Sequence, residues 1–173
     1  MTAKQAQKKH GLMPTILDVE ASGFGQGSYP LEIGLALPDG TPHCFLVMPA
    51  RDWQSWDAEA EKVHGISREV VESHGRPVEE IAWRLNGLLY GQTIYSDAWS
   101  FDMSWLGKLY DKVDMPQTFK IAALGDLLSE GQQRVWDDTR RRVEQDLSLR
   151  RHRASGDARI LQETYRRTLT LAA

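Results

Sequence analysis

Apolar residues recur along this chain in two patterns, short runs typical of strands and longer stretches with helical spacing. In the first half, three short apolar runs predict strands, and turn residues at 38–41 predict that the second and third strands form a hairpin. The Gly-rich segment 24–28 is predicted to be a loop, and it lacks the Lys-Ser/Thr ending of a phosphate-binding P-loop. The predicted strands cover 15–19, 31–37 and 44–48.

Helical spacing dominates the second half. Pro77 suits the first turn of a helix, apolar residues then recur at intervals of three and four, and Gly91 ends the run. A short strand is predicted at 93–95, and 119–124 fits either a strand or another buried segment. Further helices are predicted at 101–109, 130–146 and 156–170. Three mostly antiparallel strands followed by alternating helices and strands predict an α/β fold with a mixed β-sheet covered by α-helices.

Composition adds limits to this picture. The 173 residues are 41% hydrophobic and 26% charged, as in globular domains, and no apolar run reaches the roughly 18 residues of a membrane span. Residues 1–13 are polar and lack the apolar stretch of a signal peptide, so we expect a flexible lead-in followed by a single domain at 14–173. The single cysteine, Cys44, is predicted to be a small core residue, and a reducing cytoplasm fits a chain with no disulfide.

The charge is distributed unevenly. Residues 1–133 carry a net charge of −7 and residues 134–173 one of +4. A basic C-terminal segment attracts anionic polymers, although a solvated helix face explains it as well. If the first interpretation holds, Arg150, Arg151 and Arg153 are the expected contacts to a phosphate backbone.

Two carboxylates, Asp18 and Glu20, lie in the first predicted strand. Side chains two apart on a strand point to the same face, where two unpaired anions repel each other. A divalent cation such as Mg²⁺ or Mn²⁺ removes that repulsion and prefers oxygen ligands. Carboxylates at a strand end are also common in solvent, so this pair alone leaves both interpretations open.

Two later stretches favour the metal interpretation. Asp102 follows a polar and aromatic segment at a strand-to-helix junction, and His152 lies five residues before Asp157. In this order, Asp-x-Glu, Asp and His-x-x-x-x-Asp, the sequence resembles the DEDDh 3′–5′ exonucleases of the DnaQ-like, ribonuclease H-fold superfamily. The segment 64–67, His-Gly-Ile-Ser, is similar to one common in that family. The resemblance spans about residues 14–170.

The resemblance implies a ribonuclease H-like mixed sheet with helices on both faces and a 3′–5′ exonuclease activity that releases nucleoside 5′-monophosphates. It implies two Mg²⁺ or Mn²⁺ ions bound by Asp18, Glu20, Asp102 and Asp157, with Asp18 bridging both ions. His152 becomes the general base, because an imidazole exchanges protons readily near neutral pH. The implied substrates are single-stranded RNA, DNA or short oligonucleotides, and several compact relatives are homodimers.

Around these motifs the sequence both keeps and departs from the family pattern. Many members follow the first Glu with two threonines, where this chain has Ala21 and Ser22. Backbone amides from Ala21 to Gly23 are still expected to contact the terminal nucleotide. Phe24 and Trp99 are candidates for stacking on a base, whereas Phe101 is predicted to pack in the core. Asp97 stands where many relatives have Asn, which places an extra anion in the expected substrate groove.

Two other functions remain open from the sequence. One is a nucleic-acid-binding or regulatory module that has the fold without the activity, which retention of all five motif residues disfavours. The other is a phosphodiesterase for a small nucleotide. No residue selects RNA over DNA, because that choice rests on contacts to the 2′-hydroxyl group. His64 fits a packing role in its loop about as well as a catalytic one.

Overall fold

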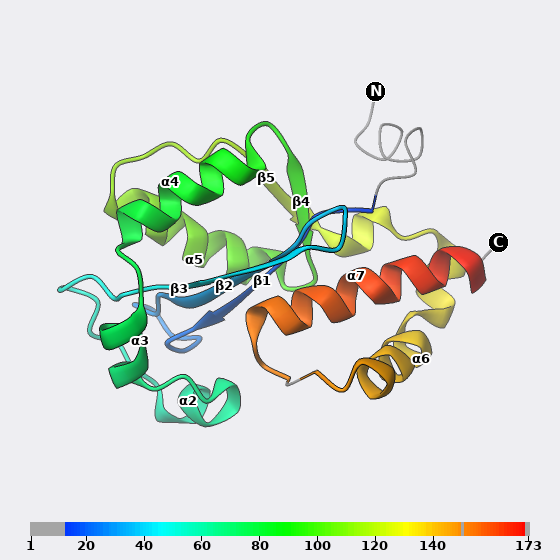
Figure 1. Cartoon of the computed structure of the whole chain (residues 1–173), viewed down its shortest axis with the longest axis horizontal. Helices are drawn as coiled ribbons and strands as arrows, with labels where there is room; N and C mark the ends of the chain where they lie inside the picture. The colour runs from blue at the N-terminus through cyan, green and yellow to red at the C-terminus, as the bar shows by residue number, and fades with distance from the viewer. Residues whose placement is uncertain (1–12, 150, 172–173) are drawn as a thin grey trace.

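The computed structural model describes residues 13–149 and 151–171, so the predicted lead-in lies almost entirely outside the described residues. Its centre is a five-stranded sheet with the order β3-β2-β1-β4-β5 (Figure 1). β1 pairs antiparallel with β2 and parallel with β4. On the outer sides, β3 pairs antiparallel with β2, and β5 pairs parallel with β4. The strands are Ile16–Ala21, Pro30–Ala36, Pro42–Leu46, Thr93–Ser96 and Lys120–Ala123.

The predicted hairpin between the second and third strands is confirmed. β2 and β3 pair from Glu32↔Leu46 to Ala36↔Pro42. The turn closes through the Leu37 amide bonded to the Thr41 carbonyl and through Gly40, whose φ of 83° suits glycine. β3 ends earlier than predicted, at Leu46. The segment predicted at 119–124 is a strand followed by the short 3-10 helix η1, Leu124–Leu127.

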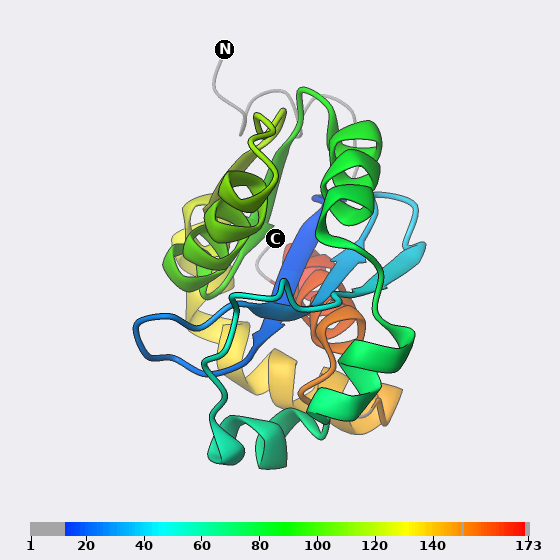
Figure 2. The ribbon, with the colours of Figure 1, turned by 90° about the vertical axis from the view of Figure 1, so that its left-hand side faces the viewer.

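Helices cover both faces of the sheet, as predicted. α4, Val78–Leu89, and α5, Trp99–Lys112, lie on one side, and α7, Ala154–Leu171, lies on the other (Figures 1 and 2). α6, Glu130–Leu147, packs along α7 and begins with a capping box formed by Ser129 and Gln132. No described helix has both the length and the apolar character needed to cross a membrane.

The alternation of side chains along β1 separates two cores. Leu17 and Val19 join the larger core under α4 and α5, with residues such as Ile81 and Leu106. Ile16 joins the smaller core under α7, together with Ala158. Because Asp18 and Glu20 share the parity of Ile16, both carboxylates belong to the face that α7 covers.

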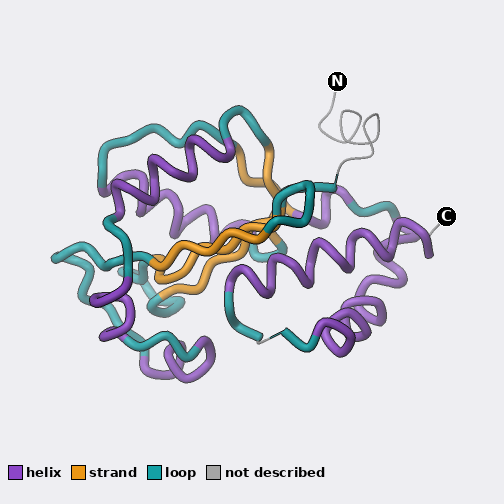
Figure 3. Tube along the Cα trace, in the orientation of Figure 1, coloured by secondary structure: helices purple, strands orange, loops and turns teal. Residues whose placement is uncertain are grey.

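Two short helices between β3 and α4 were not predicted: α2, Ala58–His64, and α3, Arg68–His74 (Figure 3). Each has seven residues and buries one side chain, so neither has an apolar stripe long enough to produce helical periodicity. Their capping residues could have predicted them. The side chains of Asp57 and Ser67 each accept an amide at the start of a helix, and Gly65 and Gly75 follow the last residues of the two helices.

The prediction that Cys44 is a core residue is wrong. Cys44 is exposed on the edge strand β3, and its thiol donates to Glu32 Oε1 over 3.3 Å. An apolar run on an edge strand leaves one face uncovered, which composition alone does not reveal.

Candidate active site

The first motif lies at the centre of the sheet. Asp18 and Glu20 are in register with Gly34 and Glu32 of β2, and β1 is the strand at which the pairing changes from antiparallel to parallel. The backbone register shifts between Glu20 and Ala21, where β1 leaves the sheet and the Gly-rich loop begins. Both carboxylates are therefore fixed by their pairing with β2, while β1 meets β4 near its start, where Ile16 pairs with Tyr95.

Asp102 comes from the first turn of α5, directly after β4. Asp102 is 1% exposed, and its Oδ2 accepts a hydrogen bond from Ser96 Oγ at the end of β4. The same Ser96 oxygen accepts the amide of Ala98 at 3.0 Å. Ser96 thus joins the strand end to the helix start and orients the Asp102 carboxylate.

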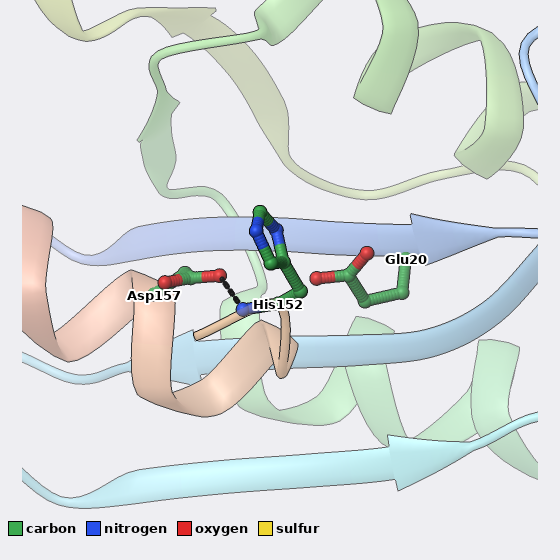
Figure 4. Close-up of side chains that lie close together, drawn as sticks. All are labelled: Glu20, His152 and Asp157. Atoms are coloured by element: carbon green, nitrogen blue, oxygen red, sulfur yellow. Dashed lines mark hydrogen bonds between the residues drawn. The ribbon is translucent and has the colours of Figure 1, made fainter. Parts of the chain in front are cut away.

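The third motif lies at the beginning of α7. His152 adopts a left-handed backbone conformation, with φ of 57°, which is uncommon for a non-glycine residue. Its amide donates to Asp157 Oδ2 at 2.8 Å, so Asp157 fixes the turn that presents the histidine. Glu20, His152 and Asp157 each offer a ligand atom within 4.8 Å of the others, and Figure 4 shows the imidazole between the two carboxylates.

All five motif residues line one cavity of about 220 Å³, although they come from β1, α5 and the start of α7. The structure therefore brings together Asp18, Glu20, Asp102, His152 and Asp157. The cavity is also lined by the aromatic residues Phe24 and Trp105 and by Arg140 and Arg151.

Burial and crowding make these carboxylates costly to ionise. Desolvation, and then Asp102 and Glu20, raise the pKa of Asp18 well above its usual range. Desolvation and Asp157 raise the pKa of Glu20 to about 7. Desolvation also raises the pKa of Asp102 to about 7, against the hydrogen bond from Ser96, and it raises that of Asp157 against the lowering effect of Arg151. Added positive charge would reduce the repulsion among these carboxylates.

These shifts predict a pH-dependent stability in metal-free buffer. For Glu20 and Asp102 the pKa in the folded state is higher than in the unfolded state. Below about pH 4 both groups are neutral and the free energy of unfolding is at its full value; it falls as pH rises through 7 and they ionise. We therefore expect the Tm of the metal-free protein to fall between pH 5 and pH 8, and Mn²⁺ to recover it at pH 8.

Differential scanning fluorimetry of the wild type and Glu20→Gln checks this expectation. His64 titrates with the opposite sign, because burial lowers its pKa, but it is common to both proteins and cancels in the comparison. Identical Tm–pH curves for the two proteins would contradict the assigned repulsion.

Asp97, the departure from the family pattern, is paired. Its Oδ2 accepts from Arg140 of α6 at 3.0 Å, and Arg140 also contacts Glu144. Arg151 bridges Glu144 at 2.7 Å and Asp157 at 3.3 Å. The extra anion is thus paired with the guanidinium of Arg140, whereas Arg151 pairs with Glu144 and Asp157, and both arginines line the cavity. Of the three arginines predicted to contact phosphate, Arg153 is bound to Glu32, and Arg150 lies outside the described residues.

A second cavity of about 310 Å³ adjoins the first and is lined by Ala21, Gly23, Phe24 and His64 as well as Glu20 and His152. His64 is 3% exposed, and its Nδ1 accepts the amide of Ile66. Burial lowers the pKa of His64, and the backbone of Ala21 partly offsets this effect. His64 Nε2 is buried and has no hydrogen-bond partner among the described residues. His64 therefore has a structural hydrogen bond and faces a cavity as well.

Two predicted substrate contacts lie elsewhere. Ser22 is 1% exposed. Its amide donates to the Tyr29 carbonyl at 2.9 Å and its hydroxyl accepts the Tyr29 amide at 3.1 Å, so both groups are used inside the protein. Trp99, the first residue of α5, is 40% exposed and is not part of the lining of either of these two cavities.

Aromatic side chains form the outer wall of the site. Phe24 contacts Phe101 and Trp105 with ring centroids 5.6 and 5.8 Å apart, and Phe101 contacts Trp105 at 5.8 Å. The prediction that Phe101 packs in the core is wrong, since it is 48% exposed, and Phe24 is 73% exposed. An exposed aromatic surface beside a charged cavity is suited to stacking against a planar group.

The residues present fit divalent cations. They supply carboxylate oxygens and one imidazole, the ligands that such ions take. Asp157 Oδ1 is buried and accepts no hydrogen bond from the described residues, its one ion-pair contact being Arg151 Nε at 3.3 Å. Two divalent ions would balance the charge of the four motif carboxylates. The arrangement can thus bind cations and bring a phosphate to them.

The sheet order, the change from antiparallel to parallel pairing and the helices on both faces define a ribonuclease H-like α/β fold. Solved structures share it. Exonuclease I without ligand matches with a TM-score of 0.69 and 14% identity over 92% of this chain. Zinc-bound E. coli exonuclease I in complex with single-stranded DNA matches at 0.67 and 15% over 91%, and E. coli exonuclease I with a dA16 oligonucleotide at 0.67 and 13% over 91%.

This chain spans about two fifths of those proteins, covering 42%, 41% and 40% of their lengths, respectively. No protein-family model matches the sequence, and no curated protein matches it. At these identities the likeness shows a shared fold, and a fold by itself does not fix a function.

Sequence reasoning did not single out Ser96, Arg140 or Glu32 as part of the site. Ser96 and Arg140 reach it only through tertiary contacts with Asp102 and Asp97. Glu32 had one available signal, a lone charged residue within the apolar run 31–37, which is unusual for a strand buried on both faces.

Proposed function

We propose that this protein is a divalent-metal-dependent 3′–5′ exonuclease that releases nucleoside 5′-monophosphates from single-stranded RNA, DNA or short oligonucleotides. The observation that carries the proposal is the single cavity lined by Asp18, Glu20, Asp102, His152 and Asp157, which are drawn from three distant segments. The fold shared with exonuclease I, which has been solved with single-stranded DNA, supports the same substrate class.

In this proposal Asp18, Glu20, Asp102 and Asp157 would hold two Mg²⁺ or Mn²⁺ ions. Bound ions of this kind stabilise the attacking and leaving oxygens of a phosphoryl displacement. His152 accepts the proton of the attacking water, and Asp157 holds the backbone that presents it through the 2.8 Å bond to the His152 amide. Arg140 and Arg151 line the cavity and supply positive charge toward the phosphate.

In this proposal the terminal nucleotide occupies the second cavity, next to the reacting phosphate. Ala21 and Gly23 line this cavity, and Phe24 lines both cavities. A ribose and base in this cavity put the 3′ end of the strand inside and the rest of the strand outward, which favours removal of one nucleotide at a time.

The homodimer expected from the resemblance stays a prediction.

The test is release from oligonucleotides labelled at the 3′ terminal nucleotide. Matched RNA and DNA oligomers of several lengths are incubated with Mg²⁺, Mn²⁺ or EDTA, and a strand whose 3′ end is blocked by an inverted nucleotide is the control for polarity. We expect labelled mononucleotide as the first product, no product in EDTA, and no reaction of the blocked strand.

Each other outcome contradicts the proposal and favours a different function. Internal cleavage of the blocked strand indicates an endonuclease. Tight binding without hydrolysis indicates a nucleic-acid-binding module. Hydrolysis of dinucleotides or nitrophenyl phosphodiesters, with longer strands intact, indicates a small-nucleotide phosphodiesterase.

Phe24→Ala is predicted to weaken substrate binding with little change in kcat. A stacked base contributes about 1–3 kcal/mol, so KM for a single-stranded oligonucleotide should rise about 5- to 150-fold. Trp83→Ala is the matched control, because Trp83 is also largely exposed, at 70%, but lies on α4 and lines neither of the two cavities. Equal KM values for Phe24→Ala and the wild type would place the substrate elsewhere.

A further inference from the structure

We propose that Glu32 and Gly34 of β2 form a seat for the first turn of α7, and that this seat positions His152 and Asp157 against Asp18 and Glu20. The inference deepens the proposed function and rests on it, because it assigns positioning residues for the same reaction. Neither residue lines the cavity that contains the five motif residues.

Glu32 is fully buried, and apart from the weak 3.3 Å contact of the Cys44 thiol, every hydrogen bond to its carboxylate comes from one short segment. Arg153 Nε donates to both carboxylate oxygens at 3.0 Å, and its Nη2 contacts Oε1 as well. The Ala154 amide donates to Oε2 at 2.8 Å. A buried carboxylate is tolerated only when it is paired and hydrogen-bonded. Here the charged partner and the backbone donor both belong to the residues immediately after His152.

These contacts keep Glu32 charged. Desolvation alone would raise the pKa of Glu32, but the hydrogen bonds and charge of Arg153 outweigh it and lower the pKa below its usual range. The ion pair also holds the Arg153 guanidinium, which is 38% exposed, against the sheet. The loop that carries His152 in its left-handed conformation is therefore tied down one residue later by a charged clamp.

Gly34 completes the seat by allowing contact between backbones. A Cβ placed on Gly34 would overlap the backbone of Ala154 and Ser155, far inside van der Waals contact. The first turn of α7 thus rests directly on β2, and any larger residue has to push it away. Gly34 has no left-handed φ, so close approach is the physical reason for glycine here.

The strand register links this seat to the motif carboxylates. Glu32 is the cross-strand partner of Glu20, and Gly34 is the cross-strand partner of Asp18. β1 thus presents two carboxylates to the α7 face, while the paired positions on β2 fix how closely the first turn of α7 approaches the sheet. Two adjacent strands of one sheet therefore set the distance between the carboxylates on β1 and the residues His152 and Asp157 at the start of α7.

The main test variant is Glu32→Gln, which keeps the size of the side chain and removes its charge. We expect kcat to fall about 10- to 100-fold with KM nearly unchanged, the usual cost of losing a group that orients a reacting residue. In a His152→Ala background the same change should cost clearly less than in the wild type, because the part of the effect that travels through His152 is already lost and only the part through Asp157 remains.

A second readout needs no activity. Hydrogen exchange of the metal-free protein should be faster at the His152 and Ala154 amides in Glu32→Gln and unchanged in the later turns of α7. Gln162→Met is the matched control, since the Gln162 side chain ties the middle of α7 to the carbonyls of Pro14 and Leu37 at 2.8 Å each. Gln162→Met should lower Tm and leave kcat within about twofold.

Gly34→Ala tests the close approach, with Gly107→Ala as its control because a Cβ there meets nothing within 4 Å. Loss of kcat in Gly34→Ala alone supports the seat, and Glu32→Gln decides the question if Gly34→Ala fails to fold. The inference is overturned by an unchanged kcat in Glu32→Gln, by an equal cost in the His152→Ala background, or by an equal loss in Gln162→Met. If the wild type shows no hydrolysis, the proposed function fails, and the exchange rates still decide whether the seat exists.

Discussion

Asp18→Asn is expected to abolish hydrolysis while leaving the fold intact. Asp18 lies on the central strand, and Asp102, Glu20 and Asp157 all act on its carboxylate. If it is shared by both ions, its loss removes a ligand from each of them. Turnover of a 3′-labelled oligonucleotide should fall at least about 10³-fold, as for loss of an essential catalytic group.

The same substitution is expected to stabilise the metal-free protein. Replacing one of several crowded carboxylates by a neutral group of equal size removes repulsion, so at pH 8 in EDTA the Tm should rise by about 2 °C or more, the shift that roughly 1 kcal/mol gives in a domain of this size. Asp111→Asn, an exposed position on α5, is the control and should change neither property. Activity above a few per cent of wild type, or a Tm lowered by several degrees, speaks against Asp18 as a shared metal ligand.

His152→Ala is expected to lower kcat about 10²- to 10⁴-fold at neutral pH, the usual contribution of a positioned general base. Metal titration, followed by calorimetry, should remain near wild type because all four carboxylates are kept. The acidic limb of the pH–rate profile should flatten, since a protonated imidazole cannot accept a proton. His74→Ala, at an exposed position on α3, provides the control.

The position of His152 also allows a rival result. Its ring lies within 4.8 Å of ligand oxygens of Glu20 and Asp157, close enough for it to share an ion with them. A loss of activity that excess Mn²⁺ fully restores would make His152 a metal ligand. The proton acceptor would then be sought elsewhere, first at His64, which lines the adjoining cavity.

The sequence by itself determined much of the fold. The β2–β3 hairpin followed from a turn signal between two apolar runs, and α4 followed from apolar residues at helical spacing between Pro77 and Gly91. Both depend on short-range physics, namely turn geometry and burial of one helix face. α2 and α3 were missed for the same reason, because each buries one side chain and has no period to detect.

The sequence also predicted the motif residues. Asp18 and Glu20 lie two apart on one strand, so their side chains were expected on the same face. Their meeting with Asp102, His152 and Asp157 in one cavity required the tertiary structure. So did the pairing of Asp97 with Arg140, because the partners are 43 residues apart. A one-dimensional pattern carries no information about which side chain lies opposite at such separations.

Exposure was likewise decided by the tertiary structure. Cys44 and Phe101 both lie in apolar segments, yet one is on an edge strand and the other borders the cavity. The role of Glu32 is the clearest case, since a buried anion in an apolar strand has no local explanation. The partners that compensate its charge, Arg153 and the Ala154 amide, are 121 and 122 residues further along the chain. Local patterns fix which elements form and which face is apolar, whereas contacts between distant elements decide which buried charges are compensated and where the site is held.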